Sequence, residues 1–172
     1  MEKRWSDIEL RAIGRRLEGY AAVFDQETRV AGSREIIRSG AFTNTIGVGR
    51  DILALANHDA TQVLARTKSG TLRLAEDTRG LHFDLDLPDT TAGRDVLALA
   101  ERGDLGGMSF GFKVPAGGET RSNGLRELRA IDLYEISVVS AFPAYEGTAV
   151  QARNLQEPDN AGLLRTLNRW RH

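Results

Sequence analysis

The sequence predicts a mainly β domain with flanking helices, in the α+β class. Most of the chain consists of short apolar runs bounded by glycine or polar residues, which is typical of buried strands. One segment, residues 81–87, alternates strictly between apolar and polar side chains, and two short segments have the spacing of helices. A length of 172 residues is enough for one domain with a sizeable core and a tail.

The first elements are predicted before residue 50. Residues 19–24 form an apolar run that favours a buried strand. A short helical turn is predicted after Ser39-Gly40, because Phe42 and Ile46 lie four residues apart and glycines follow them.

The next segments predict three strands. Residues 51–57 are another apolar run with polar boundaries. Residues 63–67 and 71–75 flank a Ser69-Gly70 turn, and this arrangement predicts a β-hairpin.

The strongest strand signal is followed directly by the strongest helix signal. Residues 81–87 have one apolar and one polar face, and Pro88 ends the strand. Thr90 or Thr91 then caps a helix that runs to about residue 102, where Gly103 takes the left-handed position.

The last third of the chain predicts two strands, a loop and a tail. Residues 108–114 and 128–141 are predicted strands, and the polar, glycine-rich residues 116–124 between them are predicted to form a mobile loop. From residue 151 the chain becomes polar and turn-rich before a small amphipathic stripe. We therefore expect a folded domain over residues 1–150 and a C-terminal tail over 151–172 with a short amphipathic helix.

Composition excludes several classes of protein. The 23 basic and 24 acidic side chains leave a formal net charge of -1, which argues against a dedicated nucleic-acid binder. The absence of cysteine excludes disulfides, thiolate zinc sites and a cysteine nucleophile. No stretch has the length of a signal peptide core or a membrane span, so a cytosolic protein without membrane contact is expected.

Three histidines limit the search for a general base, and His172 is terminal. His82 shares the polar face of its predicted strand with Asp84 and Asp86, a spacing that could present three ligands to a metal. A metal-dependent hydrolase is therefore one alternative, but a solvated strand face is the favoured interpretation because exposed faces are normally polar.

His58 and Ser109 are the candidates for base and nucleophile. His58 follows an apolar strand, where a rigid scaffold can present a side chain to a cleft, although capping or surface roles are the more common ones. Ser109 lies among bulky apolar residues with glycines on both sides, which gives the access that a nucleophile needs. A serine that simply fits the strand explains that segment equally well.

Glu135 interrupts the most apolar part of a predicted strand. An unpaired carboxylate buried there would be costly, so it requires a cation, a hydrogen-bond donor or water. A histidine that needs orienting is one such partner, and one of the many arginines is the other.

Seven segments carry a family resemblance through their order along the chain: Gly19-Tyr20-Ala21-Ala22-Val23-Phe24, Ser39-Gly40-Ala41-Phe42, Asn57-His58-Asp59, Gly80-Leu81, Gly106-Gly107-Met108-Ser109-Phe110-Gly111-Phe112, Glu135-Ile136-Ser137-Val138-Val139 and Pro143-Ala144. Together they resemble the prohead (capsid maturation) proteases of HK97-type tailed phages, over about residues 17–150. That family is similar in fold to the herpesvirus assemblins, which implies a closed or nearly closed β-barrel with helices around it.

The resemblance also implies a serine endopeptidase without a metal or organic cofactor. By position, Ser109 matches the nucleophile and His58 the base, and Glu135 is our choice for the third member, where assemblins use a second histidine. Backbone amides of residues 140–144 are candidate oxyanion donors by analogy.

The implied substrate is the scaffolding segment of the major capsid protein, together with the protease's own termini. The expected location is the inside of a procapsid in the cytoplasm of a host bacterium, with self-association and without direct nucleic-acid binding. The alternative is a non-catalytic capsid-assembly scaffold or chaperone with the same barrel, because fold resemblance alone does not exclude it.

Overall fold

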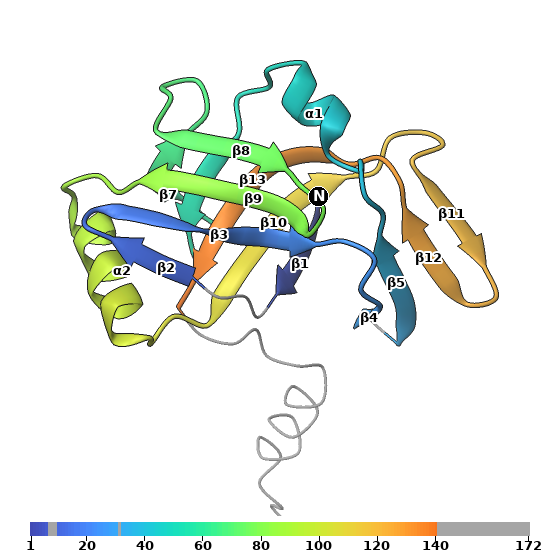
Figure 1. Ribbon diagram of the computed structural model, residues 1–172, viewed down its shortest axis with the longest axis horizontal. Helices are drawn as coiled ribbons and strands as arrows, with labels where there is room; N and C mark the ends of the chain where they lie inside the picture. The colour runs from blue at the N-terminus through green and yellow to red at the C-terminus, as the bar shows by residue number, and fades with distance from the viewer. Residues whose placement is uncertain (7–9, 31, 141–172) are drawn as a thin grey trace, which may run out of the picture. The chain divides into compact units, whose positions relative to one another are not determined.

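The computed structural model describes residues 1–6, 10–30 and 32–140 (Figure 1). Strands predominate in these ranges and helices are few, which confirms the predicted mainly β class. The expected domain boundary at residue 150 and the tail over 151–172 lie outside the described residues. No helix in the described ranges is long and apolar enough to cross a membrane.

The first sheet has five strands and carries the candidate site. Its strands, in spatial order, are β1 (Glu2–Ser6), β10 (Gly107–Lys113), β13 (Asp132–Val139), β6 (Leu53–Ala56) and β7 (Asp59–Arg66). All neighbours are antiparallel except β13 and β6, which run parallel. The parallel pair aligns Ala56, the last residue of β6, with Val138 near the end of β13.

Two four-stranded sheets complete the described fold. The second sheet has the order β2 (Leu10–Ile13), β3 (Arg16–Val23), β9 (Gly80–Asp86), β8 (Leu72–Glu76). The third has the order β11 (Glu119–Ser122), β12 (Leu125–Leu128), β5 (Ser33–Ile37), β4 (Thr28–Val30). The described strands form these three sheets and no closed barrel is found among them, so the expected barrel is unconfirmed.

The hydrophobic core joins the first and second sheets, whose strands cross one another in Figure 1. The apolar side chains of β9 and those of β10 are all buried: Leu81, Phe83 and Leu85 from β9, and Met108, Phe110 and Phe112 from β10. Burying each contributes about 1.5–3 kcal/mol. Because strand side chains alternate, this burial on one face of β10 fixes Ser109 on the other face.

Both helices predicted within the described residues are present. Helix α2 (Thr91–Arg102) begins at Thr90, whose side chain accepts a hydrogen bond from the Gly93 amide, and ends at Gly103 with φ 73°. Helix α1 (Thr43–Gly47) forms where the spacing of Phe42 and Ile46 predicted a helical turn, and the Ile46 amide donates to the Phe42 carbonyl. These segments were predictable because their end signals are local.

The predicted hairpin over residues 63–75 is wrong. Strand β7 pairs with β6 in the first sheet, whereas β8 pairs with β9 in the second. The Ser69-Gly70 turn therefore carries the chain from one sheet to another. A turn sequence specifies a change of direction, while the buried faces of the strands select their ladder partners.

Two predictions near the end of the domain are also corrected. Residues 116–124 contain strand β11 rather than only a mobile loop, and the Asn123-Gly124 turn joins it to β12 with φ of 50° and 74°. The long strand predicted over 128–141 begins later, at Asp132 of β13, because Leu128 is the last residue of β12 in the third sheet. The amides of Arg129 and Ala130 both donate to the Gly118 carbonyl at this corner.

Candidate active site

Three strands of the first sheet bring the predicted site residues together. Ser109 on β10 lies opposite Ser137 on β13, and Gly111 lies opposite Glu135. Because side chains alternate along a strand, Ser109, Ser137 and Glu135 share one face of the sheet. His58 follows β6 after a single intervening residue.

His58 reaches this face through an unusual backbone turn. Asn57 and His58 have φ of 51° and 60°, a left-handed conformation that costs energy for residues other than glycine. Hydrogen bonds hold the turn, because the Asn57 amide donates to the Val138 carbonyl at 2.9 Å and the His58 amide donates to Ser137 Oγ at 3.1 Å. The Asn57 side chain also bonds to Ser140 through both its oxygen and its nitrogen.

The imidazole of His58 bridges the other two predicted residues. Its Nε2 lies 2.8 Å from Ser109 Oγ, and its Nδ1 lies 2.7 Å from Glu135 Oε1. A carboxylate can only accept, so Nδ1 carries the proton in this contact and Nε2 of the neutral ring is free to accept from the serine hydroxyl. This is the order of contacts that nucleophile, base and orienting group require.

Glu135 is buried and fully engaged by polar partners. The residue is 4% exposed. One carboxylate oxygen accepts a hydrogen bond from His58 Nδ1, and the other accepts from Ser137 Oγ at 2.8 Å. Of the two partners that the sequence left open, the structure therefore selects the histidine over an arginine. Two hydrogen bonds offset the cost of burying this carboxylate.

Two further residues at the site were not identified from the sequence. Ser137 is completely buried, and its hydroxyl links the Glu135 carboxylate to the His58 amide. Its one signal was its position two residues after Glu135, which puts both on the same face of a strand. Gly111 leaves room for the carboxylate, since a Cβ there would stand 2.4 Å from Glu135 Oε1.

Strand β1 covers the candidate nucleophile and was not predicted. Trp5 is the register partner of Ser109, and the Ser109 hydroxyl donates to the Arg4 carbonyl oxygen at 2.7 Å. Ser109 is consequently only 3% exposed. The short, charged composition of residues 2–6 gives no apolar run from which a strand could be inferred.

The oxyanion donors suggested by analogy fall mostly outside the described residues. Residues 141–144 are not described. The Ser140 amide donates to Asn57 Oδ1 at 2.9 Å, so in this conformation it serves to hold the turn.

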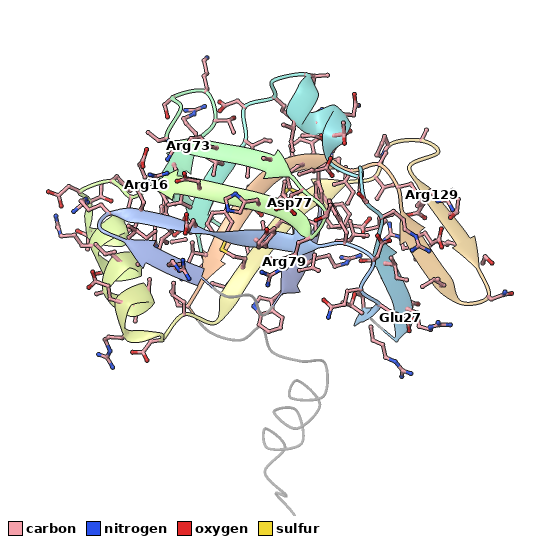
Figure 2. The ribbon with its side chains drawn as sticks, viewed as in Figure 1. Arg16, Glu27, Arg73, Asp77, Arg79 and Arg129 are labelled. Atoms are coloured by element: carbon pink, nitrogen blue, oxygen red, sulfur yellow. The ribbon has the colours of Figure 1, made fainter. Side chains whose placement is uncertain are left out.

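The second histidine–carboxylate combination has a different environment. His82 packs edge-on against Tyr20, with ring centroids 5.3 Å apart. Asp84 and Asp86 are bound by Arg73 at 2.8 and 2.9 Å, and Arg16 lies beside them (Figure 2). No group of three potential metal ligands is found among the described residues, so the metal-site alternative has no structural support.

The arginines determine the charge state of this second face. Hydrogen bonds from Arg73 lower the pKa of both Asp84 and Asp86 below the usual aspartate value. Two carboxylates already paired with guanidinium groups are poor candidates for binding a cation.

Comparison with known proteins agrees with the geometry. A family model described as caudovirus prohead serine protease matches residues 6–160. The prohead protease of Enterobacteria phage HK97 is 32% identical over 155 residues, which are 89% of this chain and 65% of that protein. The chain thus spans somewhat less than two thirds of this relative's length, and no solved structure gives a significant match. The chain belongs to the caudovirus prohead serine protease family.

Proposed function

We propose that this protein is a serine endopeptidase of capsid maturation, with Ser109 as nucleophile, His58 as general base and Glu135 as the orienting third member. The observation that carries the proposal is the continuous series of contacts from Ser109 Oγ through both ring nitrogens of His58 to Glu135. Membership of the prohead protease family supports the same reaction class.

The reaction follows from the proton positions. Ser109 Oγ attacks the scissile carbonyl carbon while His58 Nε2 takes the hydroxyl proton, and the new imidazolium then donates that proton to the leaving amine. Water enters, gives its proton to Nε2 and attacks the acyl-enzyme, and the proton returns to Ser109 as the acid leaves. Glu135 keeps Nδ1 protonated and stabilises the positive ring.

Ser137 and Gly111 act as positioning residues in this scheme. The Ser137 hydroxyl holds one carboxylate oxygen of Glu135, which leaves the other oxygen directed at His58. The same hydroxyl accepts from the His58 amide, so it also supports the left-handed turn. Gly111 lets the carboxylate approach β10 closely enough to reach the ring.

The proposed substrate and location rest on the family. We place the activity on the scaffolding segment of the major capsid protein, and on the protease's own termini, inside a procapsid in the bacterial cytoplasm. None of the three roles in the proposed mechanism needs a metal or organic cofactor. Self-association within the procapsid belongs to the same proposal.

The test is co-expression with the major capsid protein of the same genome, followed by intact mass measurement of that protein. Ser109→Ala should abolish processing while particles still assemble. Processing that continues unchanged in this variant would overturn the assignment of the nucleophile.

A serine-directed fluorophosphonate separates the protease from a non-catalytic assembly module. The probe forms an Oγ–phosphorus bond and releases fluoride, so it requires an activated serine. Labelling of the wild-type chain at Ser109, and its loss in His58→Gln, supports the enzyme. Variants in which strand β1 is held less tightly over Ser109 are treated with the same probe. If these variants and the wild-type chain all remain unlabelled, the non-catalytic assembly module is the correct interpretation.

A further inference from the structure

Strand β1 lies where a serine protease would hold an extended substrate. It runs antiparallel to β10 at the outer edge of the first sheet, with Trp5 opposite Ser109. Addition of a peptide strand to a sheet edge is a common way of binding extended peptides. The β1 backbone therefore takes the place of a peptide at the nucleophile.

The contact with Ser109 withholds the nucleophile from catalysis. A hydroxyl has one proton, and two acceptors lie within reach of it, the Arg4 carbonyl oxygen at 2.7 Å and His58 Nε2 at 2.8 Å. Proton transfer to the base requires that this proton point at Nε2 instead. The bound strand thus competes with His58 for the proton on which attack depends.

The carbonyl of Arg4 is not placed as a scissile carbonyl. In acyl transfer the carbonyl oxygen points toward oxyanion donors and the carbon faces the nucleophile. Here the oxygen itself makes the hydrogen bond with Ser109 Oγ. β1 therefore resembles substrate in its position along β10 but is held in a geometry that cannot be cleaved.

The side chain of Arg4 is paired with a buried carboxylate. Its guanidinium binds both oxygens of Glu35 at 2.6 and 2.8 Å, and it lies over the Phe112 ring at 5.2 Å. Glu35 is 3% exposed, and Arg126 binds one of its oxygens at 3.0 Å. A pocket of about 180 Å³ adjoins this pair, with Arg4, Glu35 and Arg126 among its lining residues.

A second charged contact anchors the start of β1. Arg126 binds both oxygens of Glu2 at 2.6 and 2.9 Å. Its hydrogen bond holds the pKa of the Glu2 carboxyl at about 2, so Glu2 stays ionised near neutral pH. The strand is therefore fastened by its side chains as well as by its backbone.

We propose that the edge of β10 beside Ser109 is the peptide-binding site, and that it takes an extended substrate with arginine or lysine in the place of Arg4, which β1 occupies in this conformation. This inference rests on the proposed protease function and adds the class of residue that the site selects. Substrate and β1 compete for this edge of β10, so β1 inhibits the enzyme when no substrate is bound.

Charge favours a basic residue in the substrate. When β1 leaves, Glu35 loses both hydrogen bonds from Arg4 and keeps the one from Arg126, so a substrate guanidinium can replace the two that are lost. A guanidinium restores the paired contacts, whereas an ammonium provides a single point of attachment. We therefore expect arginine to be preferred over lysine, and both over neutral residues.

The first experiment uses Arg4→Gln in the full chain and measures the rate of fluorophosphonate labelling at Ser109. Losing the Arg4–Glu35 contact should loosen β1 and raise the rate about tenfold, the change expected for a hydrogen bond between charged groups. The matched control is Arg66→Gln at the end of β7, at the opposite edge of the same sheet, which removes an exposed ion pair with Asp51. An unchanged rate in a folded Arg4→Gln variant would overturn the proposal.

The second experiment measures selectivity with quenched fluorescent peptides that differ only in the residue supplying the scissile carbonyl. In the Arg4→Gln background, kcat/KM for arginine should exceed that for glutamine by about tenfold or more. Adding Glu35→Gln should reduce that ratio to near one, while Asp51→Asn should preserve it. Equal cleavage of both peptides, or a preference that survives Glu35→Gln, contradicts the basic subsite.

The two failures can be told apart. If no form of the chain is labelled or cleaves any peptide, the proposed function fails and this inference fails with it. If Ser109 is labelled at the same rate in wild type and Arg4→Gln, the protease assignment stands and the occluding role of β1 is wrong. Circular dichroism and thermal unfolding of each variant confirm that the compared proteins are folded.

Discussion

Two faces of the fold each combine a histidine with nearby carboxylates, and only one of them forms a hydrogen-bonded series with a nucleophile. Around His58, the carboxylate of Glu135 is buried and bonded to a serine and the imidazole. Around His82, Asp84 and Asp86 are held by arginines on an accessible sheet face. The difference lies in the partners of the carboxylates. Asp84 and Asp86 are paired with guanidinium groups, whereas Glu135 is hydrogen-bonded to the imidazole of His58 and can orient it.

The largest expected effect separates the two histidines directly. His58→Gln should lower kcat/KM by about 10⁴-fold or more, since the base that takes the Ser109 proton is lost. His82→Gln should change kcat/KM by less than about twofold, because His82 and its ring partner Tyr20 both belong to the second sheet, whereas the candidate site lies on the first. Peptide cleavage by the two folded variants is the measurement, and comparable losses would remove the distinction between the faces.

The carboxylates should differ in the same sense. Glu135→Gln should lower kcat by about 10²- to 10⁴-fold with the fold retained, because an amide cannot stabilise the imidazolium as a carboxylate does. Asp84→Asn should leave kcat unchanged. If Glu135→Gln unfolds the chain while its folded fraction keeps full activity, the role of Glu135 is structural.

A smaller effect is expected at Ser137, which takes no part in the proposed proton transfers and supports the site through Glu135 and His58. Ser137→Ala leaves a buried carboxylate oxygen and the His58 amide without their partner, and should destabilise the fold by about 1–3 kcal/mol. It should also lower kcat by about tenfold with little change in KM, because the ring is less well oriented. Ser122→Ala on β11 is an exposed control, and a loss of stability without any change in kcat would limit Ser137 to packing.

The smallest effect concerns pH and the arginine-bound face. The pKa values of Asp84 and Asp86 are lowered in the folded state, so Arg73 contributes stability above the ordinary aspartate range, near pH 4, that is lost as pH falls below it. Arg73→Gln should therefore lower the free energy of unfolding most above pH 5, by no more than about 1 kcal/mol after solvent screening, and the Tm should fall with it. Melting curves of both proteins between pH 7 and 3 test this, and a difference that grows on acidification would contradict it.

Local signals made some parts of the structure predictable. Helix α2 was expected with nearly correct ends because its capping threonine and terminal glycine act on neighbouring residues. Strand β9 was expected because its alternation matches a sheet with one buried face. Glu135 stood out because a carboxylate is uncommon inside an apolar strand, and His58 because the end of a strand can present a side chain to a cleft.

Other parts depend on contacts that are distant in the sequence. The partners of β7 and β8 are decided by which buried faces meet, and the intervening turn carries no record of that choice. Strand β1 begins with three consecutive charged residues, and the roles of Glu2 and Arg4 among them become clear only beside Arg126 and Glu35. Ser137 was missed because a serine in a strand is unremarkable until its neighbours across the sheet are known.

The order of strands also governs when the site can exist during synthesis. Strand β13 is the last described strand along the chain, yet it lies between β10 and β6 and carries Glu135 and Ser137. A nascent chain that ends at residue 131 has the nucleophile and the base but lacks the strand that lies between β10 and β6 in the first sheet. Almost the whole described domain must therefore be synthesised before Glu135 and Ser137 can take their places beside Ser109 and His58.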